Sequence, residues 1–206
     1  MNDGYEEVLR KIASSDPTPG GGSVSALSLA HAQALTIMVA RLTIGKKKWS
    51  KGQVMAESII SKWDEKIPTA IQLSIKDALA FDSVMDAYRL PKGDEDEKKI
   101  RDQSIRKATI GAARTPLMIA SEASDLLTDI ASFSHLCNSN AMTDLASAAE
   151  LCSSAVLIAH MNVRINLDFV KGADVDEISL KIEGIVQESE SLLEGTRAIV
   201  SERLGW

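Results

Sequence analysis

The most apolar stretch of the 206-residue sequence is SVSALSLAHAQALTIMVARLT, residues 23–43. No proline or glycine interrupts it, and its strongly polar side chains before Arg41 are His31 and Gln33. A helix that is apolar on nearly all sides is buried inside a larger assembly of helices. The continuous apolar part, from Val24 to Ala40, is shorter than the roughly 20 residues that span a bilayer. We therefore predict a core helix and no membrane span.

The rest of the chain also shows helical periodicity, and alternating β-branched runs bounded by turn residues are nearly absent. Pro68 marks a kink or a restart in the third predicted helix, and Pro116 a kink in the fourth. The predicted helices are residues 3–13, 22 or 23–43, 53–90, 95 to the 130s, 143–170 and a last one that starts near 174 and ends near 203.

Two positions carry the pattern of a capping box, in which an N-terminal side chain and an acidic residue three positions later satisfy free backbone amides. Asp94 with Glu97 precedes the fourth long helix, and Asp174 with Glu177 precedes the last. We predict an all-α protein. Its architecture is an antiparallel bundle of about six long helices that forms a single domain over residues 1–206.

Composition excludes several classes of function. The net charge of -6 and the 4% aromatic content argue against nucleic-acid binding. Cys137 and Cys152 stand alone, without the spacing of a zinc site, and indicate reduced, buried thiols in a cytoplasmic protein. The N-terminus lacks the apolar core of a signal peptide. Neither HExxH nor Glu-x-x-His occurs around the three histidines, so we predict no metal.

A glycine-rich segment, PTPGGGS (residues 17–23), opens the apolar helix. Glycines allow a ligand to approach the backbone closely, and a helix N-terminus offers free N–H groups to an anion. The segment is neither a Walker A motif nor a dinucleotide fingerprint. The alternative is a tight turn that lets helices pack closely. Pro19, Gly20, Gly21, Gly22 and Ser23 are the candidate binding residues.

Asp77 lies on the apolar stripe of the third predicted helix, on the face that also carries Phe81. A carboxyl group among apolar side chains has a raised pKa, which suits a general acid or base. The alternative is a core aspartate that pairs with a cation or caps a helix, which is the commoner case. Asp82 and Asp86 fall off this face and are expected to face solvent.

Asp144 and Asn162 share one stripe of the fifth predicted helix, and Asn138 and Asn140 mark the turn before it. Amides and carboxylates can read the donor and acceptor edges of a heterocycle. The alternatives are hydrogen bonds between helices, and for Asp144 an N-cap.

Lys46, Lys47 and Lys48 follow the apolar helix and stand beside Trp49. The helix dipole favours lysines at this end. Three in a row would also suit a ligand that carries carboxylates, even on an acidic protein.

Four segments resemble the formiminotetrahydrofolate cyclodeaminase / methenyltetrahydrofolate cyclohydrolase family. They are PTPGGGSVSAL (17–27), MVARLTIGKKK (38–48), DALAFDSVMDAYRLPK (77–92) and NVRINL (162–167). The resemblance extends over essentially the whole chain. It implies an all-helical dimer that handles one-carbon units on tetrahydrofolate. One departure is TDLA at 143–146, where Leu145 is bulkier than the residue usual in the family.

The resemblance assigns roles to the residues singled out above. The pterin is expected to meet Asp144, Asn138, Asn140 and Asn162, and the glutamate tail to meet the lysine run and the amides of residues 20–23. Asp77 is expected to be the acid–base group, with a lysine or Asp144 as a second group. Phe81 and Pro19 are expected to contact the substrate.

The expected reaction converts 5-formiminotetrahydrofolate to 5,10-methenyltetrahydrofolate and ammonia. The alternatives are a methenyltetrahydrofolate cyclohydrolase, which opens the methenyl ring to 10-formyltetrahydrofolate in the same pocket, and a catalytically silent helical bundle that binds folate or a partner. The resemblance further implies a homodimer and a separate formiminotransferase. It implies folate as substrate, with no permanently bound cofactor and no nucleic-acid or membrane partner.

Overall fold

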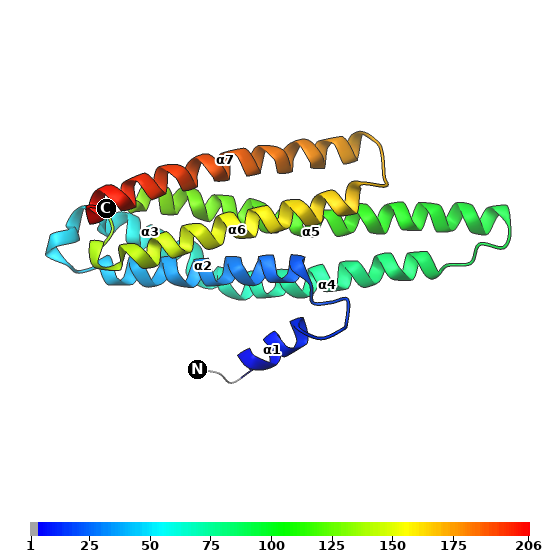
Figure 1. Cartoon of the computed structure of the whole chain (residues 1–206), viewed down its shortest axis with the longest axis horizontal. Helices are drawn as coiled ribbons and strands as arrows, with labels where there is room; N and C mark the ends of the chain where they lie inside the picture. The colour runs from blue at the N-terminus through cyan, green and yellow to red at the C-terminus, as the bar shows by residue number, and fades with distance from the viewer. Residues whose placement is uncertain (1–3) are drawn as a thin grey trace.

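Long helices that lie side by side make up nearly all of the protein (Figure 1). The computed structural model describes residues 4–206, so the predicted start of the first helix at Asp3 lies outside the described residues. The α-helices are α1 (Tyr5–Ile12), α2 (Gly21–Thr43), α3 (Gln53–Trp63), α4 (Ile67–Arg89), α5 (Glu95–Ser134), α6 (Met142–Leu167) and α7 (Ala173–Leu204). Short 3-10 turns occupy η1 (Lys47–Gly52), η2 (Asp64–Lys66) and η3 (Ser139–Ala141).

The bundle is built around α2, α4, α5 and α6, and α7 packs on α5 and α6. Within residues 4–206 there are no strands, which confirms the all-α prediction. The connection between α4 and α5 projects beyond the start of α2, and α1 stands away from the other helices (Figure 1). None of the residues of α1 is buried.

The apolar stretch that opened the sequence argument is the core helix that it predicts. Leu29 and Ile37 of α2 are at most 1% exposed, and they belong to one cluster with Phe133 of α5 and Leu145 of α6. The indole of Trp63 is fully buried in the same cluster, and its Nε1 donates to Asp129 Oδ2 at 2.8 Å. Burial of large side chains from every long helix is what holds these helices together.

Two helices have the length and composition of a membrane span: Gly21–Thr43, with 23 residues, and the segment Ser139–Leu167. The sequence argument from length is therefore insufficient. Burial distinguishes a core helix from a membrane span better than length does. In these two helices 61% and 50% of the most apolar window is buried inside the bundle. That is the environment of a core helix.

The predicted helix over residues 53–90 is two helices. The turn η2 separates α3 from α4, and Pro68 lies in the first turn of α4, where its missing N–H has no intrahelical partner to lose. Pro68 thus marks a restart. Pro116, in contrast, is buried within α5, which continues through it for 40 residues in all.

One of the two predicted capping boxes is present. Asp94 Oδ1 accepts from the Glu97 amide at 2.8 Å, and Glu97 Oε2 accepts from the Gly93 amide at 2.7 Å. The second prediction is wrong. The N-cap of α7 is Gly172, and the Asp174 carboxylate instead accepts from the Arg106 guanidinium at 2.7 and 3.1 Å.

Candidate functional site

The glycine-rich start of α2 lies between α4 and α6. A Cβ atom added at Gly22 would stand 2.3 Å from Asp77 Oδ1 of α4. A Cβ atom added at Gly21 would stand 3.5 Å from Asn162 Nδ2 of α6. The absence of a side chain at Gly22 is therefore required for the Asp77 carboxyl group to reach the backbone of α2. Gly22 is therefore needed for close packing of α2 against α4, which is the alternative to ligand binding that the sequence analysis gave for the glycine-rich segment.

Asp77 is half-buried and bonded to the first turn of α2. The Ser23 hydroxyl lies 3.2 Å from Asp77 Oδ2 and 2.9 Å from the Ser74 carbonyl oxygen, one turn earlier in α4. Burial raises the pKa of Asp77 above its usual value, and the hydrogen bonds from the Ser23 hydroxyl and amide partly oppose this. The positive end of the α2 dipole also favours the ionised form. These opposing influences suit a group that must both gain and lose a proton.

Asn162 of α6 lies at the start of α2 next to Gly21, as Asp77 of α4 lies next to Gly22. Its Nδ2 donates to the Ile158 carbonyl oxygen of its own helix at 2.8 Å, and the Asn166 amide in turn donates to the Asn162 carbonyl oxygen at 2.8 Å. The first bond holds the Asn162 side chain along α6, and the second does the same for the Asn166 side chain. The structure therefore brings together the glycine segment, Asp77 and Asn162, which sequence spacing could not show.

The exposure of Pro19, Phe81 and Ser23 differs. Pro19 is half-buried just before α2, and Phe81 is 38% exposed one turn beyond Asp77. Ser23 is fully buried and turned toward α4. Its hydroxyl is therefore directed at Asp77 and Ser74, away from a ligand in solvent.

The other predicted residues lie at the opposite end of α2. The backbone amide of Asn138 donates to Thr43 Oγ1 at 3.0 Å, and its Nδ2 donates to the Leu42 carbonyl oxygen at 2.9 Å. Asn138 thus closes the C-terminal end of α2. A 23-residue helix is about 35 Å long, so this end is far from Asp77 in the same chain.

The lysine run and the start of α6 share this distant end. Lys46, Lys47 and Lys48 are exposed directly after α2, and the Lys48 ammonium lies 4.7 Å from the Trp49 ring. Asp144 is half-buried in the first turn of α6, whose N-cap is Ala141 with no side-chain capping bond.

The exposed Asn140 stands just before α6, and its backbone amide donates to Asn138 Oδ1 at 3.0 Å. Within one chain the predicted residues therefore form two groups, one at each end of α2.

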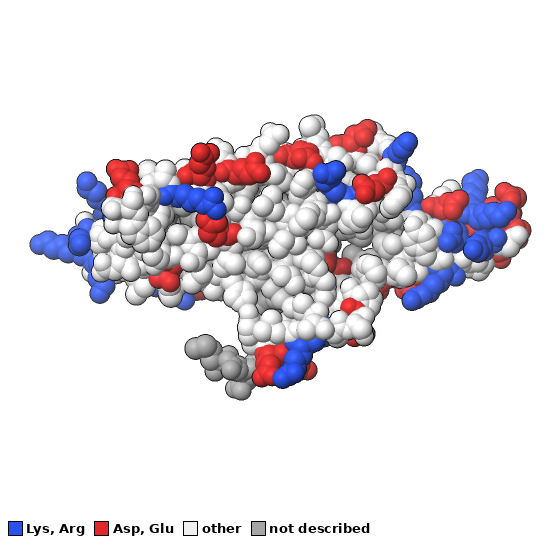
Figure 2. All heavy atoms as spheres, viewed as in Figure 1, with Lys and Arg blue, Asp and Glu red and all other residues white. Residues whose placement is uncertain are grey.

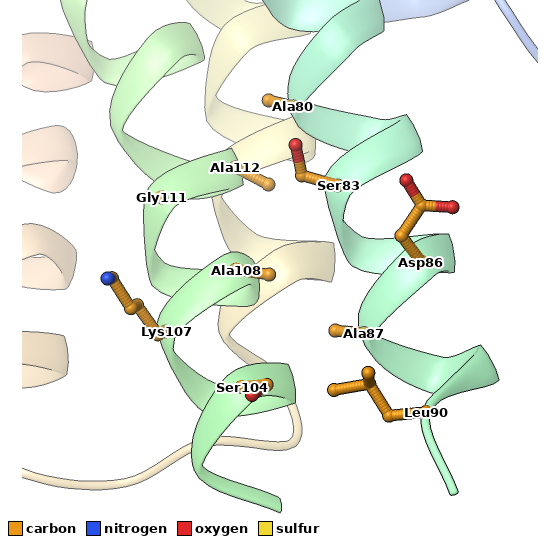
Figure 3. A pocket seen from close by; sticks show the side chains of 10 residues that line it. All are labelled: Ala80, Ser83, Asp86, Ala87, Leu90, Ser104, Lys107, Ala108, Gly111 and Ala112. Carbon is orange, nitrogen blue, oxygen red and sulfur yellow. The ribbon is translucent and has the colours of Figure 1, made fainter. Parts of the chain in front are cut away.

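A cavity that the sequence analysis missed lies between α4 and α5, beginning one turn beyond Asp77 (Figure 3). Its volume is about 570 Å³, within the range of small-molecule sites. Small side chains form most of its wall, with Asp86 and Lys107 among them. The lining residues are Ala80, Ser83, Asp86, Ala87, Leu90, Ser104, Lys107, Ala108, Gly111 and Ala112. A signal was present, because the small residues recur on both helices at intervals of three and four.

No group of three or more His, Cys, Asp or Glu side chains that could hold a metal ion occurs in the part of the chain that the structure describes. Cys137 and Cys152 are free and buried, as expected, and burial raises the pKa of both thiols.

A sequence model of a family described as formiminotransferase-cyclodeaminase matches residues 4–181. The chain belongs to this family. The match includes the glycine segment, Asp77 and Asn162, and it confirms the resemblance found in the sequence.

Relatives of this family differ in length and in name. A methenyltetrahydrofolate cyclohydrolase of Methylorubrum extorquens is 34% identical over 200 residues, covering 94% of this chain and 93% of its own length. The formimidoyltransferase-cyclodeaminase of Mus musculus is 27% identical over 184 residues, which are 89% of this chain and 34% of the mouse protein. The chain thus spans about a third of that longer relative.

The fold of this family member also matches a solved structure. A crystal structure of formiminotetrahydrofolate cyclodeaminase from Thermotoga maritima superposes with a TM-score of 0.79 at 28% identity. The superposition covers 97% of this chain and 94% of the other.

Proposed function

We propose that the protein is a folate one-carbon enzyme that converts 5-formiminotetrahydrofolate to 5,10-methenyltetrahydrofolate and ammonia. The observation that carries this proposal is the Asp77 carboxyl group, half-buried against the start of α2 with a raised pKa. Family membership supplies the substrate class, because relatives that match along nearly all of this chain carry folate names.

The chemistry needs one group that accepts and then returns a proton. Folate N10 attacks the formimino carbon and forms a C–N bond, and N10 must lose its proton. The formimino group enters as its cation, –CH=NH₂⁺, so the attack leaves an –NH₂ group on the carbon. Asp77, when ionised, accepts the N10 proton and returns it to this nitrogen; the bond from the carbon to this nitrogen then breaks, ammonia leaves and the methenyl cation forms. Holding N10 beside the carbon lowers the barrier further, since the attack becomes intramolecular within a fixed geometry.

A second candidate is the cyclohydrolase, supported by the 34% identity and matching length of the Methylorubrum relative. In this reaction ionised Asp77 takes a proton from water as its oxygen attacks the methenyl carbon. The bond from that carbon to N5 then breaks and N5 receives the proton held by Asp77. The second proton of the water leaves the hydroxyl oxygen for solvent as the C=O bond forms, which gives 10-formyltetrahydrofolate. Both reactions require the same carboxyl group at the same carbon.

A spectroscopic assay distinguishes the candidates. We expect 5-formiminotetrahydrofolate to yield the methenyl absorption band and ammonia in equal amounts. Faster decay of added 5,10-methenyltetrahydrofolate than in buffer, without activity on the formimino substrate, would favour the cyclohydrolase. Asp77→Asn should lower turnover by about 10²–10⁴-fold in either case while the fold is retained. No turnover of either substrate by the folded wild-type protein would overturn the proposal in favour of a binding role.

We also propose a homodimer. Apolar side chains that are 36–60% exposed follow α2 and α6, and they are Met38, Leu42, Leu157, Met161 and Ile165. Figure 2 shows few charged side chains over the centre of this face, whereas charges gather on α7 and on the projecting α4–α5 end. Exposed apolar patches of this kind mark interaction surfaces.

Two copies packed antiparallel through α2 would place the lysine run of one beside the glycine segment of the other. This arrangement would unite the two groups of predicted residues that a single chain keeps apart. Light scattering after size exclusion should give a dimer mass, and Met161→Glu with Ile165→Glu should give a monomer. A monomeric wild-type protein at working concentration would contradict the proposal.

The remaining expectations are proposals about the setting of the enzyme. In the cyclodeaminase role a separate formiminotransferase would supply the formimino substrate. Folate would be a substrate that leaves, so the purified protein should carry no folate absorbance. Cell fractionation should find the protein in the cytoplasm, and recovery with membranes or nucleic acid would contradict this.

A further inference from the structure

The hydroxyl of Ser23 stands between two acceptors on α4. It lies 2.9 Å from the Ser74 carbonyl oxygen and 3.2 Å from Asp77 Oδ2. A hydroxyl has one proton to donate and lone pairs with which to accept. It cannot donate fully to both oxygens at once, so its orientation must depend on which of them carries a proton.

Each protonation state of Asp77 has a fully bonded arrangement. When Asp77 is ionised, the Ser23 hydroxyl donates to Oδ2, and the Ser74 carbonyl keeps its place in the helical bonding of α4. When Asp77 is protonated, its own O–H donates to Ser23 Oγ, and the Ser23 hydroxyl turns to the Ser74 carbonyl. Buried polar groups need such partners in every populated state, and Ser23 is fully buried.

We propose that Ser23 is a positioning residue for Asp77, whose hydroxyl turns between the carboxyl group and the Ser74 carbonyl so that both protonation states are held in one place. This inference rests on the proposed function for its purpose, since an acid–base group must serve in both states. The contacts themselves do not depend on which folate reaction occurs.

Gly22 fixes the geometry of this pair. Its missing side chain leaves the space that the carboxyl group occupies, because an added Cβ would stand 2.3 Å from Oδ1 and 2.5 Å from Oδ2. The carboxyl group is therefore confined between the backbone at Gly22 and the hydroxyl of Ser23. Rotation of the Ser23 hydroxyl moves no heavy atom, so the Asp77 carboxyl group keeps its position when its protonation changes.

Charged neighbours do not account for the state of Asp77. Burial and the hydrogen bonds from Ser23 are the causes of its shifted pKa, and within residues 4–206 no cationic side chain forms an ion pair with it. The first titratable group of α2 is His31, two turns beyond Ser23, and the Tyr5 hydroxyl bonds its ring. Titratable groups on the elements around Asp77 include Asp16 before α2, Lys76, Asp82 and Asp86 on α4, Lys107, Arg114 and Glu122 on α5, and His160 and Arg164 on α6.

The experiment follows the titration of Asp77 directly, in the intact chain. Carboxyl ¹³C resonances of ¹³C-aspartate-labelled protein are recorded against pH, and Asp77→Asn assigns the Asp77 signal. Ser23→Ala removes the donor to the ionised form and the acceptor for the protonated form. Because the bond to the charged oxygen is the stronger of the two, the Asp77 midpoint should rise by about one pH unit. Ser23→Cys keeps the side-chain shape with a weaker donor, and should give a smaller rise.

Ser25→Ala is the matched control. Ser25 is also fully buried in α2, and its hydroxyl donates to the Ala155 carbonyl oxygen of α6 at 2.8 Å, away from Asp77. This variant removes a comparable bond and should leave the Asp77 midpoint unchanged. If Ser23→Ala does not fold, the Asp77 midpoints of Ser23→Cys and Ser25→Ala are compared instead, and only the Ser23 variant should show a rise. An unmoved midpoint in the folded Ser23 variants, or an equal movement in Ser25→Ala, would overturn the proposal.

The pH dependence of turnover provides the second readout. The limb that reports Asp77 should move in the same direction and by the same amount in Ser23→Ala as the ¹³C midpoint. A protein without folate turnover whose Asp77 midpoint still rises in Ser23→Ala would refute the proposed function and support the positioning role. Folate turnover together with an unmoved Asp77 midpoint in Ser23→Ala would support the proposed function and refute the positioning role.

Discussion

Replacing Gly22 with alanine tests the site at a single atom. The added Cβ would lie 2.3 Å from Asp77 Oδ1, 2.5 Å from Oδ2 and 2.6 Å from Cγ. Ordinary contact with a Cβ begins at 3.4 Å, so the carboxyl group must withdraw by about 1 Å. A displacement of that size at a reacting group lowers turnover by about 10²-fold.

The neighbouring glycine is the control for this change. A Cβ at Gly21 would meet Asn162 Nδ2 at 3.5 Å and Ile158 Cγ2 at 3.8 Å, both ordinary distances. Alanine has the higher helix propensity at either position. Gly21→Ala should therefore retain turnover within a few-fold and match or exceed the wild-type melting temperature, while Gly22→Ala loses turnover.

The assay compares kcat and KM of both variants with thermal unfolding followed by circular dichroism. The expected signature is a lower kcat in Gly22→Ala with its helical content kept, because the carboxyl group moves and the bundle remains. Equal kcat in Gly22→Ala and the wild type would refute the reasoning, since it would mean that the position of Asp77 does not matter. Equal loss in both glycine variants would refute it as well, because the loss would then have no connection with the 2.3 Å contact.

Three further predictions concern stability. Asp77→Asn should raise the melting temperature at pH 7. The folded pKa of Asp77 lies above the unfolded value of about 3.8, so ionisation of Asp77 opposes folding as pH rises. Below pH 3.8 the carboxyl group is protonated in both states, and the gain over wild type should vanish. Equal melting temperatures at pH 7 would contradict this. Trp63→Phe removes the bond from the fully buried indole to Asp129 and should cost about 2 kcal/mol in urea unfolding, with kcat retained. Gly184→Ala and Gly195→Ala on α7, where nothing lies within 4 Å of an added Cβ, should each add about 0.5–1 kcal/mol, and a loss of stability would show an unrecognised contact.

Helical periodicity in the sequence identified the features that are set by neighbours within one helix. The apolar character of residues 23–43 predicted a core helix, and the stripe through α4 singled out Asp77 before any contact was known. Both inferences use only neighbours three or four residues apart, which helical geometry fixes. The family resemblance assigned the lysine run and the amides of residues 20–23 to one glutamate tail, although the predicted helix between them, at about 1.5 Å per residue, separates them within one chain.

Contacts between distant segments were beyond this reach. The bond from the Ser23 hydroxyl to Asp77 joins residues 54 positions apart, whereas the sequence indicated only the Ser23 amide, as a ligand contact. Asp174 carries a capping pattern, yet Arg106, 68 positions away, takes its carboxylate. In each case the local sequence pattern predicted one partner, and the structure shows a different one on another helix.

The 2.3 Å approach at Gly22 also makes two positions change together. A larger residue at 22 avoids displacing the side chain at 77 only if that side chain is shorter, so a library that is selected for turnover and varies each position alone would record both as intolerant. A library that varies the pair should recover folded, inactive combinations such as alanine at 22 with serine at 77. Selection for thermal stability would then move the chain toward these combinations, and selection for turnover would retain glycine at 22 and aspartate at 77.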